Sequence, residues 1–184
     1  MSPTKLIAFR DKYGFRPLCL GKTKTGGYII ASESCAIDSV DGEFIRDIAP
    51  GEILTISSDG FKSDFIESEK TSLCVFEFIY FSRPDSIIEG ASVHQARLNA
   101  GKILAKESPV DADIVIGVPD SGIDAAIGYS MESKIPYGMG FVKNKYMGRS
   151  FIKPTQEERQ NTVKIKLNVI KETVKNKKVI LIDD

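Results

Sequence analysis

Two stretches of the sequence end in side chains that could bind a phosphorylated, metal-bound ligand. Residues 114–118 are apolar and mostly β-branched, and they lead into Pro119, Asp120, Ser121 and Gly122, after which a helical pattern begins. This order predicts a buried strand, a tight turn and a helix whose N-terminus faces the strand's carboxyl end. Backbone N–H groups at such a turn attract anions, and Ser121 adds a hydroxyl that can face a phosphate or a metal ion.

The second stretch lies at the end of the chain. Residues 178–182 are largely apolar and are followed by the adjacent carboxylates Asp183 and Asp184. Parallel strands bring their carboxyl ends to one edge of a sheet, so these acids and the Ser121 turn are expected to be neighbours. Because Mg²⁺ prefers oxygen ligands, this edge predicts a site for Mg²⁺ and a phosphorylated sugar.

A basic segment follows the first stretch. From Lys143 to Lys178 there are 11 Lys and Arg residues against 3 Glu residues, although the formal net charge of the chain is zero. A solvated basic face would explain this surplus, but we favour a basic functional loop over residues 143–154 beside the anion site. Its candidate anion-binding residues are Lys143, Lys145 and Arg149.

The pattern of the first 56 residues predicts antiparallel β-structure. Arg10 and Asp11 are expected to form a structural salt bridge at a strand end. Residues 57–72 are polar, which places a domain boundary near them. Residues 74–81 are strongly β-forming.

The second half of the chain alternates between strand and helix patterns. From Asp111 the predicted order is strand, helix, strand, loop, helix and strand, an α/β unit with a largely parallel sheet. Its last helix begins at Thr155, and its buried face is expected to carry Val163, Leu167, Ile170 and Val174.

Bulk properties exclude several classes of protein. Hydrophobic residues make up 42% and charged residues 27% of the 184 positions, as in ordinary soluble proteins. The zero net charge gives no case for nucleic-acid binding, and no apolar run is long enough to span a membrane. Without a signal peptide pattern, a cytoplasmic location is expected. Three unpaired cysteines argue against a disulfide framework.

Taken together, the motifs resemble one family, the amidophosphoribosyltransferases, also called glutamine phosphoribosylpyrophosphate amidotransferases. Each motif is weak alone, but their order and spacing are specific, and the resemblance covers essentially the whole chain. The matching segments are residues 10–18, 31–34, 80–86, 118–122, 143–149 and 179–184.

The resemblance implies two domains and a fold that combines α+β with α/β structure. Residues 1–70 would be the C-terminal part of an N-terminal-nucleophile glutaminase domain, which is antiparallel β here. Residues 71–184 would be the N-terminal part of a type I phosphoribosyltransferase domain. The family transfers ammonia, released from glutamine, to phosphoribosyl pyrophosphate (PRPP), giving 5-phosphoribosylamine, glutamate and pyrophosphate in purine biosynthesis.

Residue by residue, the resemblance assigns a site. Ser121, Asp183 and Asp184 match Mg²⁺ positions, and the two acids are also the catalytic candidates, because they would stabilise positive charge at C1 of the ribose. Ser121 would also bind PRPP and its pyrophosphate. The other matches with this role are Pro119, Asp120, Gly122, Lys143, Lys145 and Arg149.

The resemblance also suggests cofactors and partners. Cys74 matches one of four cysteines that bind a [4Fe–4S] cluster in some members, although a buried apolar cysteine is the simpler interpretation. Purine nucleotides inhibit the family, and the full-length enzymes are tetramers.

Two departures from the family pattern matter. The N-terminal cysteine nucleophile is missing, and the loop that binds the 5′-phosphate would follow Asp184. We therefore expect an internal piece of the enzyme, inactive alone and marginally folded. The alternatives are a salvage-type phosphoribosyltransferase or a non-catalytic PRPP- or nucleotide-binding piece.

Overall fold

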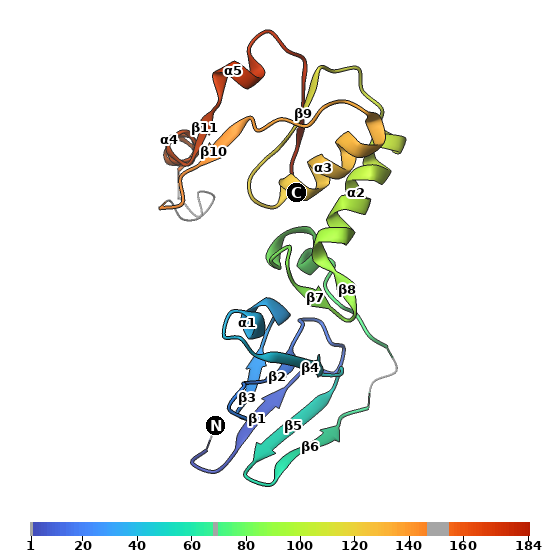
Figure 1. The fold of residues 1–184 in the computed structure, drawn as a ribbon, viewed down its shortest axis with the longest axis vertical. Coiled ribbons are helices and arrows are strands. Elements are labelled where there is room, and N and C mark those ends of the chain that lie inside the picture. Colours follow the sequence, from blue (N-terminus) through green and yellow to red (C-terminus); the bar gives the residue numbers. More distant parts are fainter. Residues whose placement is uncertain (1, 68–69, 147–154) are drawn as a thin grey trace. The chain divides into compact units, whose positions relative to one another are not determined.

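The structure, a computed structural model, describes residues 2–67, 70–146 and 155–184. It divides into two compact units, Met1–Ala96 and Arg97–Asp184 (Figure 1). The domain boundary near residue 70 stays a prediction.

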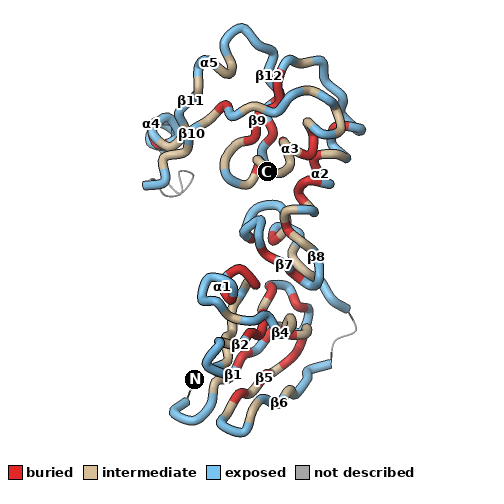
Figure 2. The backbone as a smooth tube through the Cα atoms, viewed as in Figure 1, coloured by how far each residue is buried: buried red, intermediate tan, exposed pale blue. Residues whose placement is uncertain are grey.

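The first unit contains two antiparallel three-stranded sheets. One has the strand order β1-β5-β6 and the other β3-β2-β4, as the pattern of the first 56 residues predicted for most of these strands. Alternate residues of β5 are buried, and Leu54 and Ile56 pack with Ala8, Leu20 and Ile48 in a core that is red in Figure 2. The strands are β1 (Leu6–Phe9), β2 (Cys19–Lys22), β3 (Tyr28–Ala31), β4 (Glu43–Asp47), β5 (Glu52–Ser57) and β6 (Gly60–Phe65).

Short elements complete this unit. Helix α1 (Ser34–Asp38) follows β3, and the hairpin strands β7 (Ile87–Ile88) and β8 (Ala91–Ser92) precede helix α2 (Val93–Glu107). Strand β6 lies inside the polar stretch 57–72, where composition alone shows no strand. Residues 60–65 form a strand because they pair with the buried strand β5.

The strand predicted over residues 74–81 is wrong. Residues Glu77–Phe81 instead form a π-helical turn, η1. The buried carboxylate of Glu77 explains the turn, because it accepts a hydrogen bond from Ser82 Oγ at 2.9 Å and lies 2.7 Å from Arg16 Nε. The Arg16 guanidinium also lies over the Phe81 ring, 4.7 Å from its centroid.

The second unit is built on the parallel pair β9 (Ile114–Gly117) and β12 (Val179–Ile182), which confirms the predicted parallel strands. Helix α3 (Gly122–Ser133) follows β9, and its Ala126 and Tyr129 pack with Val115, Ile180 and Ile182. Helices α2 and α3 pack closely in this unit. A Cβ added at Gly101 or at Gly128 would overlap a backbone carbonyl of the other helix, so glycine at these positions permits the close approach.

The long helix predicted after Thr155 is only partly present. Helix α4 (Gln156–Lys166) begins there, with the Thr155 side chain accepting a hydrogen bond from the Glu158 N–H at 3.2 Å. It stops at Leu167, because β11 (Leu167–Val169) pairs antiparallel with β10 (Phe141–Lys143). The short helix α5 (Lys171–Val174) follows. The predicted buried face is therefore wrong, and Val163 is 43% exposed.

Nowhere in the described part of the chain does a helix combine the length and apolar character that crossing a membrane requires.

Candidate functional site

The turn after β9 and the two acids after β12 meet at one edge of the parallel pair. The register places Ile182 opposite Gly117, so both strands end together. The Val118 N–H then donates a hydrogen bond to the Ile182 carbonyl at 2.8 Å, which extends the pairing to the turn. In Figure 1 the C-terminus accordingly lies beside the start of α3. The structure thus brings together the two stretches that the sequence predicted to be neighbours.

Glycine makes this approach possible. A Cβ on Gly122 would lie 2.5 Å from the Ile182 carbonyl oxygen and 3.3 Å from the Asp183 Cα. A Cβ on Gly117 would lie 2.7 Å from the Ile123 Cα. Since real Cβ atoms do not come this close to backbone atoms, both positions require glycine, and the first turn of α3 packs directly on the strand that carries Asp183.

Ser121 stands at the start of the helix that follows the turn. It occupies the N-cap position of α3, yet its side chain makes no capping hydrogen bond, and the residue is half-buried. The N-terminus of a 12-residue helix favours anions through its unpaired N–H groups. The preceding Pro119–Asp120 peptide is cis. Pro119, Ser121 and Gly122 of the predicted anion turn thus lie where β9 leads into the first turn of α3, as the sequence predicted.

The adjacent carboxyls of Asp183 and Asp184 interact electrostatically. Partial desolvation raises the pKa of the Asp183 carboxyl above its usual value, and the neighbouring Asp184 carboxyl adds to the shift. A divalent cation bound there would offset the repulsion between these two neighbouring carboxylates.

The donor set fits Mg²⁺. Asp183 and Asp184 offer carboxylate oxygens and Ser121 offers a hydroxyl, all hard ligands. Among residues 2–67, 70–146 and 155–184, no group of three or more His, Cys, Asp or Glu side chains could enclose a metal ion. Mg²⁺ is commonly bound by one or two carboxylates with water and substrate phosphates, so this small set suits it.

The basic residues divide into three cases. Lys143, at the end of β10, donates a hydrogen bond and forms an ion pair with the Asp120 carboxylate of the anion turn. Lys145 is exposed, and Arg149 lies outside the described residues. The sequence placed Asp120 and Lys143 in one site but did not predict that they pair, because 23 residues separate them.

Cys74 does not have the surroundings of a cluster ligand in the described part of the chain. It is half-buried, and its backbone N–H bonds to the Phe15 carbonyl at 3.0 Å. Cys19 and Cys35 are buried and join no cluster of potential ligands there. An iron–sulfur cluster needs several thiolates, so these three residues alone cannot hold one, and the match of Cys74 to a cluster ligand stays a prediction.

The predicted salt bridge of Arg10 with Asp11 is wrong. Arg10 is buried and pairs with Glu89, with 2.7 Å between Nη2 and Oε1. Asp11 instead accepts hydrogen bonds from the N–H groups of Tyr13 and Phe15 and so closes its own turn. The sequence motif around residues 10–18 is therefore structural in this unit.

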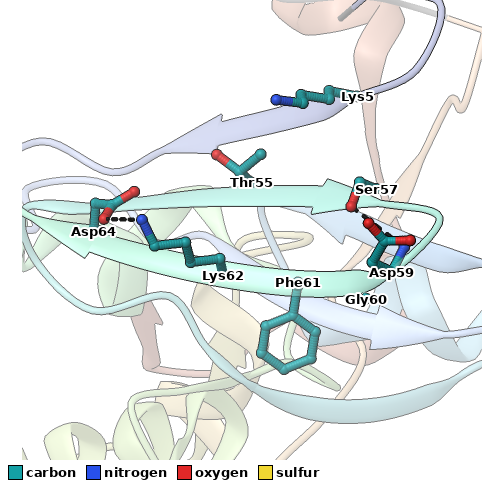
Figure 3. A pocket seen from close by; sticks show the side chains of 8 residues that line it. All are labelled: Lys5, Thr55, Ser57, Asp59, Gly60, Phe61, Lys62 and Asp64. Carbon is teal, nitrogen blue, oxygen red and sulfur yellow. Dashed lines mark hydrogen bonds and ion pairs between the residues drawn. The ribbon is translucent and has the colours of Figure 1, made fainter.

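A shallow depression of about 350 Å³ lies on the β5–β6 hairpin (Figure 3). Its charged side chains are exposed, and Lys62 and Asp64 pair with each other at 2.9 Å. None of the predicted site residues lines it, so it is a weaker candidate than the β9–β12 edge.

Comparison with known proteins relates the chain to one family of enzymes, although no protein-family model matches it. It is 53% identical over 182 residues to amidophosphoribosyltransferase of Archaeoglobus fulgidus, covering 97% of this chain and 39% of that protein. For the Bacillus subtilis amidophosphoribosyltransferase the identity is 48% over 185 residues, covering 100% and 39%.

The solved structures agree. Glutamine PRPP amidotransferase from B. subtilis, complexed with ADP and GMP, matches with a TM-score of 0.87 and 47% identity, covering 100% of this chain and 40% of that one. A second structure, described as the allosteric regulatory enzyme of purine biosynthesis, matches with a TM-score of 0.88. The chain is therefore a homologue of the amidophosphoribosyltransferases along its whole length, and it spans about two fifths of the length of these relatives.

Proposed function

We propose that this chain forms the pyrophosphate- and magnesium-binding edge of an amidophosphoribosyltransferase, which converts PRPP and glutamine-derived ammonia to 5-phosphoribosylamine. The observation that carries the proposal is the junction of the Ser121 turn with Asp183, fixed by the 2.8 Å hydrogen bond from Val118 to Ile182. The relatives do not favour a salvage-type transferase or a non-catalytic binding piece. They are named amidophosphoribosyltransferases, and they match this chain over essentially its whole length.

The reaction exchanges two bonds at C1 of the ribose. Ammonia forms a C–N bond, the C–O bond to pyrophosphate breaks, and the electron pair of that bond leaves with pyrophosphate. The ammonium group formed at C1 then releases one proton to water to give the amine. The backbone N–H groups at the start of α3 and the Ser121 hydroxyl would hold the leaving group, with Lys143 and Lys145 adding positive charge. Asp183 and Asp184 would face the ribose and stabilise the positive charge that develops at C1. Mg²⁺, when bound, would neutralise charge on the departing pyrophosphate.

Several features of the whole enzyme belong to the same proposal. Glutamine hydrolysis, feedback binding of purine nucleotides, assembly as a homotetramer and a cytoplasmic location are supported by the resemblance of the motifs. A [4Fe–4S] cluster at Cys74 would need ligands from outside the described residues.

Calorimetric titration of the chain with pyrophosphate and with PRPP, each with and without Mg²⁺, tests the site. We expect Mg²⁺-dependent binding that weakens at least tenfold when Asp183→Asn and Asp184→Asn are combined. Asp111→Asn is the matched control, because Asp111 is an exposed acid near the opposite ends of the same strands, paired with Lys178 at 2.8 Å.

Circular dichroism of each variant separates loss of binding from loss of fold. Binding that is the same in the wild type and in the double variant would overturn the magnesium assignment. A folded chain that binds neither ligand would overturn the proposed site altogether.

A further inference from the structure

The anion turn contains an acid whose charge opposes the ligand that the turn is built to bind. Asp120 lies between Pro119 and Ser121, and its carboxylate accepts a hydrogen bond from the Lys143 ammonium. We propose that Asp120 is a built-in competitor for Lys143, so that a pyrophosphoryl group binds by replacing the carboxylate at this ammonium. This inference rests on the proposed pyrophosphate site and specifies how that site is regulated.

The two partners are held differently. The Lys143 side chain is 26% exposed, whereas that of Asp120 is 75% exposed. Lys143 lies opposite Leu167 in the β10–β11 pair, and the next residue, Asn144, donates its N–H to the Lys166 carbonyl at 2.7 Å. The backbone of Lys143 is therefore fixed on both sides, and exchange would proceed by release of the Asp120 side chain.

The charges also favour exchange over simple addition. The described site residues carry three carboxylates, those of Asp120, Asp183 and Asp184, against the ammonium groups of Lys143 and Lys145. A polyanion that entered without exchange would meet an acid already bound to Lys143. Exposed ion pairs are held weakly in water, so a phosphate oxygen that is also held by the N-terminus of α3 can displace this one.

The opposite role for Asp120 makes the opposite prediction. If Asp120 served to orient Lys143 toward the ligand, removing its charge would weaken binding of pyrophosphate. If it competes, the same change strengthens binding. The sign of one substitution therefore distinguishes the two roles.

The test is a titration of pyrophosphate with Mg²⁺ into the wild type, Asp120→Asn, Lys143→Gln and the double variant. We expect Asp120→Asn to bind about threefold more tightly or better, with the difference growing at low ionic strength. We expect Lys143→Gln to bind more weakly, and Asp120→Asn to give little gain in the Lys143→Gln background. Asp120→Ala serves as a second charge-removing variant.

Lys145→Gln is the matched control, because it removes a nearby exposed ammonium that does not hold Asp120 in the described contacts. We expect its effect to add to that of Asp120→Asn, in contrast to the non-additivity at Lys143. Affinity that is unchanged or lower in both Asp120 variants would overturn the inference, as would full additivity with Lys143→Gln.

Failure of the proposed function has a different signature. In that case Asp183→Asn with Asp184→Asn leaves the binding of pyrophosphate unchanged, whatever happens at Asp120. If the double variant loses binding but Asp120→Asn gains none, the proposed site stands and the competitor role is wrong.

Discussion

The carboxylate of Glu52 lies 2.6 Å from Nη2 of Arg46, and this ion pair joins the two sheets of the first unit. Glu52 is on β5 and is fully buried, whereas Arg46 is on β4 of the other sheet. The second carboxylate oxygen accepts hydrogen bonds from Arg46 Nη1 and from the Ala49 N–H, both at 2.8 Å. Ser63 Oγ donates to the first oxygen at 2.5 Å. Every charge in this buried cluster is therefore compensated.

This cluster should make stability depend on pH. Hydrogen bonding to Arg46 lowers the pKa of Glu52 from its ordinary 4.5 to about 2. Because the folded value is the lower one, the stabilisation is present above pH 4.5 and is lost as the pH falls from there toward 2. Glu52→Gln should lower the free energy of unfolding at pH 7 by about 2–3 kcal/mol and flatten its pH dependence in that window.

Urea denaturation at several pH values measures both effects. Asp64→Asn is the control, because Asp64 lies on the paired strand β6 in an exposed ion pair with Lys62, where the expected loss is below about 0.5 kcal/mol. If Glu52→Gln kept the acid dependence of the wild type, another group would have to cause it.

Replacing Arg10 should lower the stability of the fold, even when the new residue is lysine. Its guanidinium donates hydrogen bonds to the carbonyls of Arg16, Ile48 and Gly14 at 2.9, 2.7 and 2.8 Å, in addition to its pair with Glu89. Lysine carries one donor nitrogen in place of three, so Arg10→Lys leaves carbonyls unsatisfied and should cost about 2–3 kcal/mol.

Glu89→Gln gives the comparison for that measurement. Its side chain is 40% exposed and can still accept a hydrogen bond, so the expected loss is below about 1 kcal/mol. Equal losses for the two variants in urea denaturation would show that the ion pair, rather than the carbonyl network, is the stabilising element.

The sequence pattern correctly predicted the features that depend on residues close together in the chain. The apolar runs that became β9 and β12 identified a parallel pair, and the strand order then placed Ser121 and Asp183 at one edge. Pairing between distant segments decided the rest. Leu167 is in a strand and not in the predicted helix, because it pairs with β10. Arg10 forms its ion pair with Glu89, which is 79 residues away. No periodicity in a single sequence encodes such partners.

One of the three thiols should react before the other two in the folded chain. Burial raises the pKa of the Cys19 thiol to about 11 and also raises that of Cys35, whereas Cys74 is half-buried. At pH 8 only about one Cys19 in a thousand would be thiolate, even without the steric block. A chromogenic thiol reagent should therefore label Cys74 first, and Cys19 and Cys35 only on unfolding in urea. Labelling of Cys19 as fast as that of Cys74 in the folded chain would contradict the buried position.

Gly122→Ala should damage the site more than it damages the fold. The added Cβ would press on the Ile182 carbonyl and toward the Asp183 Cα, so the first turn of α3 and the two acids must move apart. Overpacking of this kind costs about 1–3 kcal/mol of stability. Gly101→Ala is the matched control, because its Cβ would collide with the Ala125 carbonyl between α2 and α3 and leave the β9–β12 edge in place. Gly101→Ala should lose at least as much stability in urea as Gly122→Ala, but only Gly122→Ala should also lose Mg²⁺-dependent binding of pyrophosphate at least tenfold. Equal binding by the two variants would mean that the close approach of α3 to Asp183 serves packing alone.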